Sequence, residues 1–279
     1  MTNITVAPGK GRHLCPAMEV MGYIAALFIG VSLGLIGGGG SILTIPVLVY
    51  LFGLSPLMAT SYSLFVVGAT SLVGSVSSYR KGWVDVKTVF LFGLSSIVTV
   101  FGTRKFIIPL IPEIIYVGTY PVSFSLLTMV LFAVLMLLAS LSMIRGRTKE
   151  EAVSPHGSHV LLLSLYGIGI GLITGFLGAG GGFLLIPALV ILLRLPMKKA
   201  VGTSLLIIAL NSLVGFVGDI GQYHTDWGLL LSVSLIAISG VFIGGRLSKK
   251  IAGDSLKKGF GWFVLLMGLY IIMREILLR

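Results

Sequence analysis

Charged residues are scarce in this chain of 279 residues: Asp, Glu, Lys and Arg together make up 10% of it, while 56% is hydrophobic. A soluble globular protein carries about 25% charged residues. Such a small charged fraction cannot cover a water-facing surface, which excludes a soluble globular domain and indicates an integral membrane protein. The mean hydropathy of +1.07 supports the same interpretation.

Cysteine is almost absent as well. Cys15 is the single cysteine in the sequence, so no disulfide framework can form within the chain. Residues 1–19 contain Lys10, Arg12 and Pro16 but no apolar core. We therefore expect a short soluble tail at this end and not a signal peptide.

Acidic residues and histidine are missing from the centres of the apolar segments. All nine acidic residues and all four histidines fall in tails, in linkers or at segment ends. Cation transporters and proton pumps place such groups inside the membrane, so this distribution argues against a cation substrate and leaves no obvious side-chain proton relay. His224 and Asp226 are too isolated a pair for a metal site, and we expect neither a metal nor a cofactor.

Apolar segments are what the chain has in abundance. Polar residues separate ten of them, five in each half, and the second in each half is short: 20–36, 42–53, 57–79, 88–103, 121–144, 160–177, 183–193, 196–218, 228–245 and 259–273. Because the stretch RGRTKEEAVSPHGSH between the halves has no apolar periodicity, it reads as a linker. The predicted organisation is a tail (1–19), a first transmembrane repeat (20–144), a cytoplasmic linker (145–159) and a second transmembrane repeat (160–279).

The two halves are copies of one another. Residues 30–74 align without a gap with residues 171–215, a shift of 141, and 19 of the 45 positions are identical. An internal repeat in a membrane protein is typical of transporters whose binding site lies at the repeat interface.

The basic residues distinguish parallel from inverted repeats. With five passages in each half, 14 of the 20 Lys and Arg residues fall on the side of the linker and 6 on the other; with four crossings in each half, the division is 10 and 10. Cytoplasmic loops are enriched in Lys and Arg. We therefore predict an all-α membrane fold of two inverted repeats, five helical segments each, with both termini outside. The net charge of +11 reflects this bias or, alternatively, an electropositive route for anions.

A glycine-rich element occurs once in each half, as LIGGGGSILTIPVL from Leu35 and as LGAGGGFLLIPALV from Leu177. A helix of 12 residues spans ~18 Å, whereas the hydrocarbon core is ~30 Å thick, so each short helix after the glycines begins inside the membrane. The unpaired N–H groups at a helix start carry partial positive charge, and glycine lets a ligand approach them. Two such starts that meet at the midplane would bind an anion.

Tight helix packing is the alternative interpretation of any glycine cluster. We give that interpretation to the pairs Gly30/Gly34 and Gly171/Gly175, which have the GxxxG spacing. A glycine tetrad followed by a short helix and a proline, Pro46 in one half and Pro187 in the other, is harder to explain by packing alone.

Hydroxyl, amide and guanidinium groups complete the predicted anion site. Ser, Thr and Asn can instead join transmembrane helices or bond their own backbone, and an arginine at a helix end can extend to the interface. Arg104 and Arg246 recur at matched positions of the repeat and could bind an oxyanion. The predicted substrate-binding residues are Gly38, Gly39, Gly40, Ser41, Gly180, Gly181, Gly182, Thr70, Ser71, Asn211, Ser212, Arg104 and Arg246.

The duplicated element, GLIGGGGSILTIPVL and GFLGAGGGFLLIPALV, resembles that of the TauE/SafE family of sulfite exporters. The resemblance extends from about residue 20 over nearly the whole chain. It implies a multi-pass transporter of the cell inner membrane whose partners are the lipid bilayer and a small sulfur-containing anion, such as sulfite, thiosulfate or an organosulfonate. It implies no nucleic-acid partner and leaves the oligomeric state open.

Two other functions compete with transport. One is a membrane-embedded enzyme acting on a lipid phosphate, which would need an acid, a base or a nucleophile that the apolar segments lack. The other is an assembly subunit that transports nothing. Substitutions in the glycine tetrads separate these alternatives, because only a transporter would lose flux while it stays folded.

Overall fold

The structure, a computed structural model, describes residues 16–112, 114–117, 120–145, 160–178, 180–193, 195–222, 225–248 and 253–277. Residues 1–15 of the predicted tail and residues 146–159 of the predicted linker lie outside the described residues.

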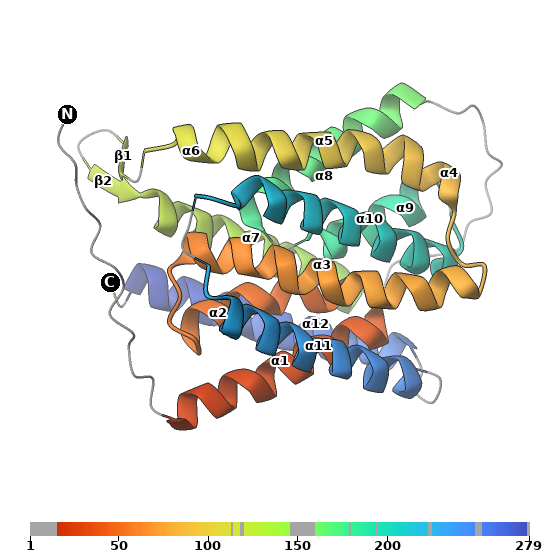
Figure 1. The fold of residues 1–279 in the computed structure, drawn as a ribbon, viewed down its shortest axis with the longest axis horizontal. Helices are drawn as coiled ribbons and strands as arrows, with labels where there is room; N and C mark the ends of the chain where they lie inside the picture. Colours follow the sequence, from red (N-terminus) through yellow and green to blue (C-terminus); the bar gives the residue numbers. More distant parts are fainter. Residues whose placement is uncertain are drawn as a thin grey trace.

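Helices form nearly all of the described chain and lie roughly along one common direction (Figure 1). The first half contains α1 (Pro16–Ile36), the 3-10 helix η1 (Gly39–Leu43), α2 (Thr44–Tyr50), α3 (Pro56–Arg80), a continuous helix of α4 (Val86–Thr88), η2 (Val89–Gly93), α5 (Leu94–Gly102), η3 (Thr103–Ile107) and α6 (Ile108–Leu110), and α7 (Phe124–Arg145). The second half contains α8 (Val160–Leu177), α9 (Gly182–Leu193), α10 (Met197–Asp219), α11 (Trp227–Leu247), α12 (Gly253–Ile272) and η4 (Met273–Leu277).

Six described helices are long and apolar enough to cross a membrane, and they contain the stretches 18–35, 56–80, 86–110, 124–141, 197–219 and 227–247. The two helices that directly follow the glycine-rich segments are shorter, as the sequence predicts. The chain is therefore a multi-pass, mostly helical membrane protein.

The direction of the helices alternates along the chain (Figure 1). Helix α1 begins at the left of the view and α8 begins at the right, and the same opposition holds between α3 and α10 and between the helix containing α5 and α11. The described chain begins and ends on the left side, because η4 follows α12 back toward the start of α1.

Close helix packing explains the two glycine pairs outside the tetrads. A methyl group on Gly30 would meet the carbonyl oxygen of Ala237, and Gly34 faces the α11 backbone in the same way. In the second half a methyl group on Gly171 would lie 2.7 Å from the carbonyl oxygen of Ser96, in α5. These glycines let α1 approach α11 and let α8 approach α5, which confirms the GxxxG interpretation.

The starts of two crossing helices are tied to the long central helices, α3 and α10. Asp85 begins α4 and accepts a hydrogen bond from the Lys87 N–H, while its own N–H donates to the Thr203 hydroxyl of α10 at 2.9 Å. Asp226 caps α11 by accepting from Leu229 N–H, and its own N–H donates to the Tyr62 hydroxyl of α3. Each cap thus satisfies donors that a helix start leaves unpaired.

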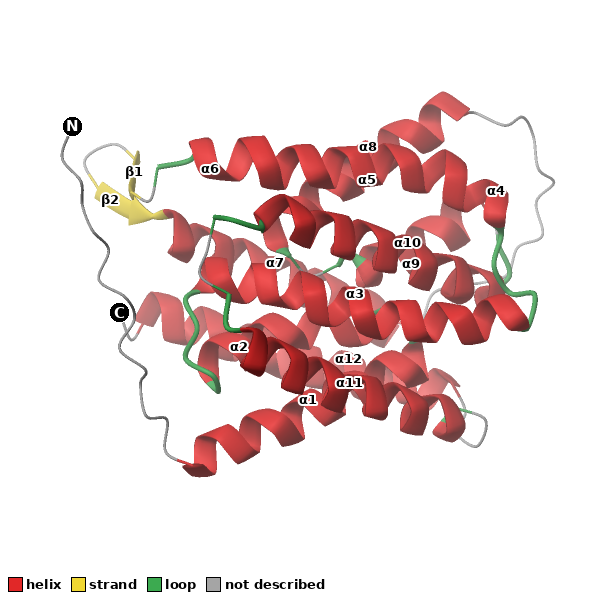
Figure 2. Cartoon of the chain, in the orientation of Figure 1, coloured by secondary structure: helices red, strands yellow, loops and turns green. Residues whose placement is uncertain are grey.

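A small hairpin interrupts the otherwise helical pattern of this all-α membrane fold (Figure 2). Strands β1 (Ile114–Val117) and β2 (Tyr120–Ser123) pair antiparallel, with Ile114 opposite Ser123 and Val117 opposite Tyr120. Helix α7 consequently begins at Phe124, three residues later than the apolar segment from 121 predicts. The β-branched residues Ile114, Ile115, Val117 and Val122 explain the change, because β-branched side chains favour strands.

Candidate functional site

The two glycine-rich segments touch each other inside the bundle. A methyl group on Gly38 would lie 2.8 Å from the Cα of Gly182, and one on Gly182 would meet the carbonyl oxygen of Gly38. Gly38 precedes η1, and Gly182 is the first residue of α9. The backbones therefore approach so closely that only glycine fits at either position.

This junction lies beside the middle of the two central helices. A methyl group on Gly180 would lie 2.6 Å from the Val67 side chain and 3.1 Å from the Ile208 side chain. Val67 and Ile208 stand near the midpoints of α3 and α10. Residues from both halves of the chain thus contact the junction, at about half the length of these two helices.

The two segments reach the junction by different backbone paths. In the first segment Gly37 has a positive φ of 87°, whereas in the second Gly178, Gly180 and Gly181 have φ values of 68°, 66° and 67°. Residues other than glycine rarely adopt this left-handed region. The second segment is therefore the more dependent on glycine for its conformation.

Two buried hydroxyls touch the junction: a methyl group on Gly180 would lie 2.9 Å from Ser212 Oγ, and one on Gly181 would meet Thr174 Oγ1. Four more buried polar atoms lie on α2, α3 and α10. Like the first two, they have no hydrogen-bond partner among the described residues. The six atoms are Thr44 Oγ1, Ser63 Oγ, Ser71 Oγ, Thr174 Oγ1, Ser212 Oγ and Asn211 Oδ1.

Such atoms are unusual, because a buried polar group without a partner costs about 1–3 kcal/mol. The side chains that carry these six atoms belong to residues at most 1% exposed. Five are hydroxyls, which can donate a hydrogen bond as well as accept one. A group of hydroxyl donors next to a glycine junction can hold an oxyanion.

Several of the predicted ligands are instead satisfied by the protein. Thr70 donates to the carbonyl oxygen of Val66 at 2.7 Å, within its own helix. Ser41 donates to the carbonyl oxygen of Gly38 at 2.8 Å. Gly40 packs against the backbone of α1, since a methyl group there would lie 2.8 Å from the carbonyl oxygen of Ile29. These positions shape the junction but present no side-chain donor to a ligand.

Asn211 links α10 to α5 and keeps one polar atom available. Its Nδ2 donates to Ser96 Oγ at 2.8 Å, and both residues are fully buried. Its Oδ1 is among the buried atoms without a partner in the described part of the chain. Ser96 was not predicted as a site residue. It stands beside Ser95 in α5, and nothing in the sequence distinguished one serine from the other.

Arg104 is fully buried beside the second glycine segment, whereas Arg246 is exposed in the last turn of α11. The two arginines, which the sequence predicts as ligands at matched positions of the repeat, therefore lie in different environments. Arg104 lies in the π-helical segment η3, whose extra residue per turn changes the direction of the side chains. A methyl group on Gly178 would lie 2.6 Å from Arg104 Nη2, so the glycine leaves room for the guanidinium.

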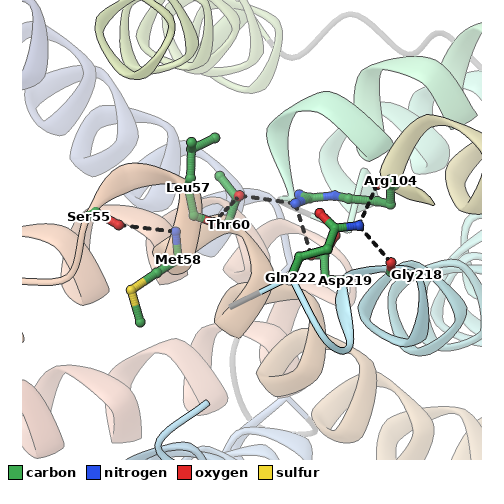
Figure 3. Close-up of polar contacts among 8 residues, drawn as sticks. All are labelled: Ser55, Leu57, Met58, Thr60, Arg104, Gly218, Asp219 and Gln222. Atoms are coloured by element: carbon green, nitrogen blue, oxygen red, sulfur yellow. Dashed lines mark hydrogen bonds and ion pairs between the residues drawn. The ribbon is translucent and has the colours of Figure 1, made fainter. Parts of the chain in front are cut away.

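The partner of Arg104 is Asp219, as Figure 3 shows. Arg104 Nη1 lies 3.1 Å from Asp219 Oδ2 and donates to Thr60 Oγ1 at 3.2 Å. The side chain of Asp219 is 1% exposed, which corrects the expectation that no acidic residue lies inside the bundle. Gln222 links the backbones on which the pair stands, because its Nε2 donates to the carbonyl oxygens of Arg104 at 3.2 Å and Gly218 at 3.0 Å.

A multi-pass helical bundle made of two related halves that meet at a glycine junction is the architecture of a membrane transporter. Residues 23–271 match the family described as Sulfite exporter TauE/SafE, and the chain belongs to this family.

Curated relatives carry names that agree with this class. A probable membrane transporter protein of Xylella fastidiosa (strain 9a5c) is 30% identical over 88% of this chain and 92% of its own length. The probable membrane transporter protein YunE of Bacillus subtilis (strain 168) is 28% identical over 83% of this chain and 89% of its own. MJ0441 of Methanocaldococcus jannaschii, also named a probable membrane transporter protein, is 22% identical over 93% and 96%. No solved structure matches the chain.

Proposed function

We propose that the protein exports small sulfur-containing oxyanions, such as sulfite, across the cell inner membrane, and that the anion binds at the glycine junction. The observation that carries this proposal is the backbone contact between Gly38 and Gly182, with Ser212 and Thr174 beside it as buried hydroxyls. Oxyanions accept hydrogen bonds, and both of these hydroxyls can donate one because neither has a partner among the described residues.

The proposal includes inverted repeats with the junction on their interface. Helix pairing supports it, because exchanging the halves converts the α1–α11 contact into the α8–α5 contact and leaves the α3–α10 and α7–α12 contacts as they are. The two helix caps support it as well. By the shift of 141, Asp85 corresponds to Asp226 and Thr203 to Tyr62, so the Asp85–Thr203 and Asp226–Tyr62 hydrogen bonds are equivalent with the two halves exchanged.

The orientation belongs to the proposal too. The side where α7 ends and α8 begins is the cytoplasmic one, because most Lys and Arg residues fall there, and both termini are outside. In a cell that is negative inside, a monovalent anion leaves with a gain of ~2.3 kcal/mol per 100 mV. Export of an oxyanion therefore needs no separate coupling ion.

Reconstitution into liposomes tests the proposal. The wild-type protein is expected to release sulfite, thiosulfate or sulfoacetate down an imposed potential, and the absence of flux for every one of these anions would contradict the proposed function. Sulfate serves as the comparison oxyanion that shows how far the site discriminates.

A matched pair of threonine variants locates the site. Thr174→Val keeps the shape of the side chain but removes a hydroxyl that touches the junction, so flux should fall at least tenfold. Thr128→Val removes a hydroxyl that donates to its own helix at the carbonyl oxygen of Phe124, and flux should stay near the wild-type value. Equal flux from the two variants would place the substrate elsewhere.

A further inference from the structure

The buried ion pair between Arg104 and Asp219 joins segments that are far apart in the sequence. Its neighbours are Thr60 at the start of α3, Gly178 in the second glycine segment and Gln222 after α10. The pair thus links η3 to the end of α10 and the start of α3, on the side of the molecule where α10 ends and α3 begins (Figures 1 and 3).

The carboxylate of Asp219 and a sulfur oxyanion have the same chemistry toward a guanidinium. Both present oxygen atoms that accept charge-assisted hydrogen bonds, and arginine binds such groups through its planar fork. Asp219 is held beside Arg104 by the chain itself, so it competes with any mobile anion at a high effective concentration.

The carboxylate of Asp219 lies next to an exposed turn, into which it can move when it leaves the ion pair. It is the last residue of α10, and the next two residues, Ile220 and Gly221, are exposed. Gly221 has a positive φ of 88° and no atom within 4 Å of an added methyl group, so no neighbouring element covers that face of the turn just beyond the carboxylate. Rotation of this end would bring Asp219 into water, where a single charge is not costly.

The matched positions of the other half, all of which the structure describes, form no equivalent pair. Ser78 occupies the position that corresponds to Asp219 and donates to the carbonyl oxygen of Gly74, and Arg246 is exposed. Val201 stands where Thr60 stands and faces Gly37. The device therefore exists on one side of the membrane only.

We propose that Asp219 is a built-in counter-ion that the transported anion displaces from Arg104, so that the pair is a gate which opens when an oxyanion arrives from the glycine junction. This inference rests on the proposed anion transport and adds to it the residue that sets anion affinity. Gly178, at the contact between the second glycine segment and the guanidinium, connects the two sites.

Binding measurements on the purified full-length protein test the gate. Calorimetric titration with sulfite is expected to give a 10- to 100-fold lower Kd for Asp219→Asn than for the wild type, because the guanidinium loses its internal competitor, and a 10- to 100-fold higher Kd for Arg104→Gln. Two controls remove the same charges at exposed positions: Lys105→Gln, on the residue after Arg104, and Asp226→Asn. Both should bind sulfite as the wild type does.

The outcomes separate this inference from the proposed function. If the wild type binds and transports no sulfur oxyanion, the proposed function fails and the gate fails with it. If the wild type binds sulfite but Asp219→Asn binds it no more tightly, the ion pair is structural and the gate alone is overturned.

An unstable variant still gives an answer. Asp219→Asn leaves the buried Arg104 without its carboxylate, and extraction in sulfite should then yield folded, monodisperse protein where chloride of equal ionic strength does not. Equal yields in the two salts would contradict the proposal. Asp219→Glu keeps the charge, and its sulfite Kd should stay nearer to that of the wild type than to that of Asp219→Asn.

Discussion

The two halves of the molecule share the backbone contacts that pack their helices but differ in the polar contacts of their matched arginines. Gly30 contacts the Ala237 backbone, and Gly171 contacts the Ser96 backbone. The two contacts are equivalent, because the shift of 141 relates Gly30 to Gly171 and Ser96 to Ala237. In contrast, Arg104 is buried in an ion pair while its counterpart, Arg246, is exposed.

Further differences are concentrated around the glycine junction. Thr174 corresponds to Leu33 and Thr44 to Leu185, and all four side chains are buried. Duplicated halves keep the contacts that fix helix positions, because any change there displaces a whole helix. Polar groups that face the interior are free to diverge, and their divergence marks where the two sides of a transporter differ in function.

The ion pair provides the largest expected difference between the halves. Arg104→Gln leaves Asp219 either buried without a compensating charge or displaced into water at the end of α10, so the free energy of unfolding should fall by up to about 3–5 kcal/mol. Arg246→Gln removes the same charge from an exposed position and should change it by about 0.5 kcal/mol at most. Chemical denaturation in detergent measures both values, and similar losses would show that the halves are not as different as their burial indicates.

The helix-packing glycines should behave alike in the two halves. Gly30→Val and Gly171→Val each force a side chain into the backbone of the facing helix, and each should lower the free energy of unfolding by about 1–3 kcal/mol. Gly102→Ala is the control, because no atom lies within 4 Å of a methyl group there and alanine is the better helix former. A large loss in only one half would contradict the shared packing.

The sequence predicted the repeated parts of the fold well. Spacing and identity between the halves were enough to predict the helix packing at Gly30 and Gly171 and the short helices after the glycine tetrads. Such features depend on local patterns that occur twice, and a coincidence is improbable when both copies agree.

The features that occur once were the ones that sequence reasoning missed. Asp219 ends an apolar segment, where a carboxylate is normally in contact with water, and only the approach of Arg104 from a distant helix explains its burial. The β1–β2 hairpin likewise has no counterpart in the second half among the described residues. Pairing between segments far apart in the chain leaves no periodicity to detect.

The hydrogen bonds at the helix starts should have equal and moderate effects. Tyr62→Phe removes the acceptor for the Asp226 N–H, and Thr203→Val removes the acceptor for the Asp85 N–H. Each variant should lose about 0.5–1.5 kcal/mol of unfolding free energy, the usual contribution of one hydrogen bond. A thermal unfolding series of the two single variants and the double variant measures both terms. Losses that differ several-fold would show that the two caps are not equivalent.

The smallest expected effect on stability accompanies a large expected effect on binding. Ser71 and Ser212 occupy matched positions of the repeat, both are fully buried, and neither hydroxyl has a hydrogen-bond partner among the described residues. Ser71→Ala and Ser212→Ala therefore break no hydrogen bond within the protein, and neither should lower the free energy of unfolding by more than about 0.5 kcal/mol. If the hydroxyls bind the anion, each variant should raise the Kd for sulfite about tenfold, as one lost hydrogen bond to a charged group predicts.

Ser75→Ala is the matched control for these two variants, since Ser75 lies one turn after Ser71 in α3 and donates to the carbonyl oxygen of Leu72 at 2.7 Å. It should leave the Kd unchanged. An increase for Ser212→Ala alone would show that the anion contacts only the half of the junction where Gly180 touches that hydroxyl, and equal increases would place it on the axis between the halves. Unchanged affinity in both variants, with stability preserved, would remove the hydroxyls from the site, because no structural role would then conceal their contribution.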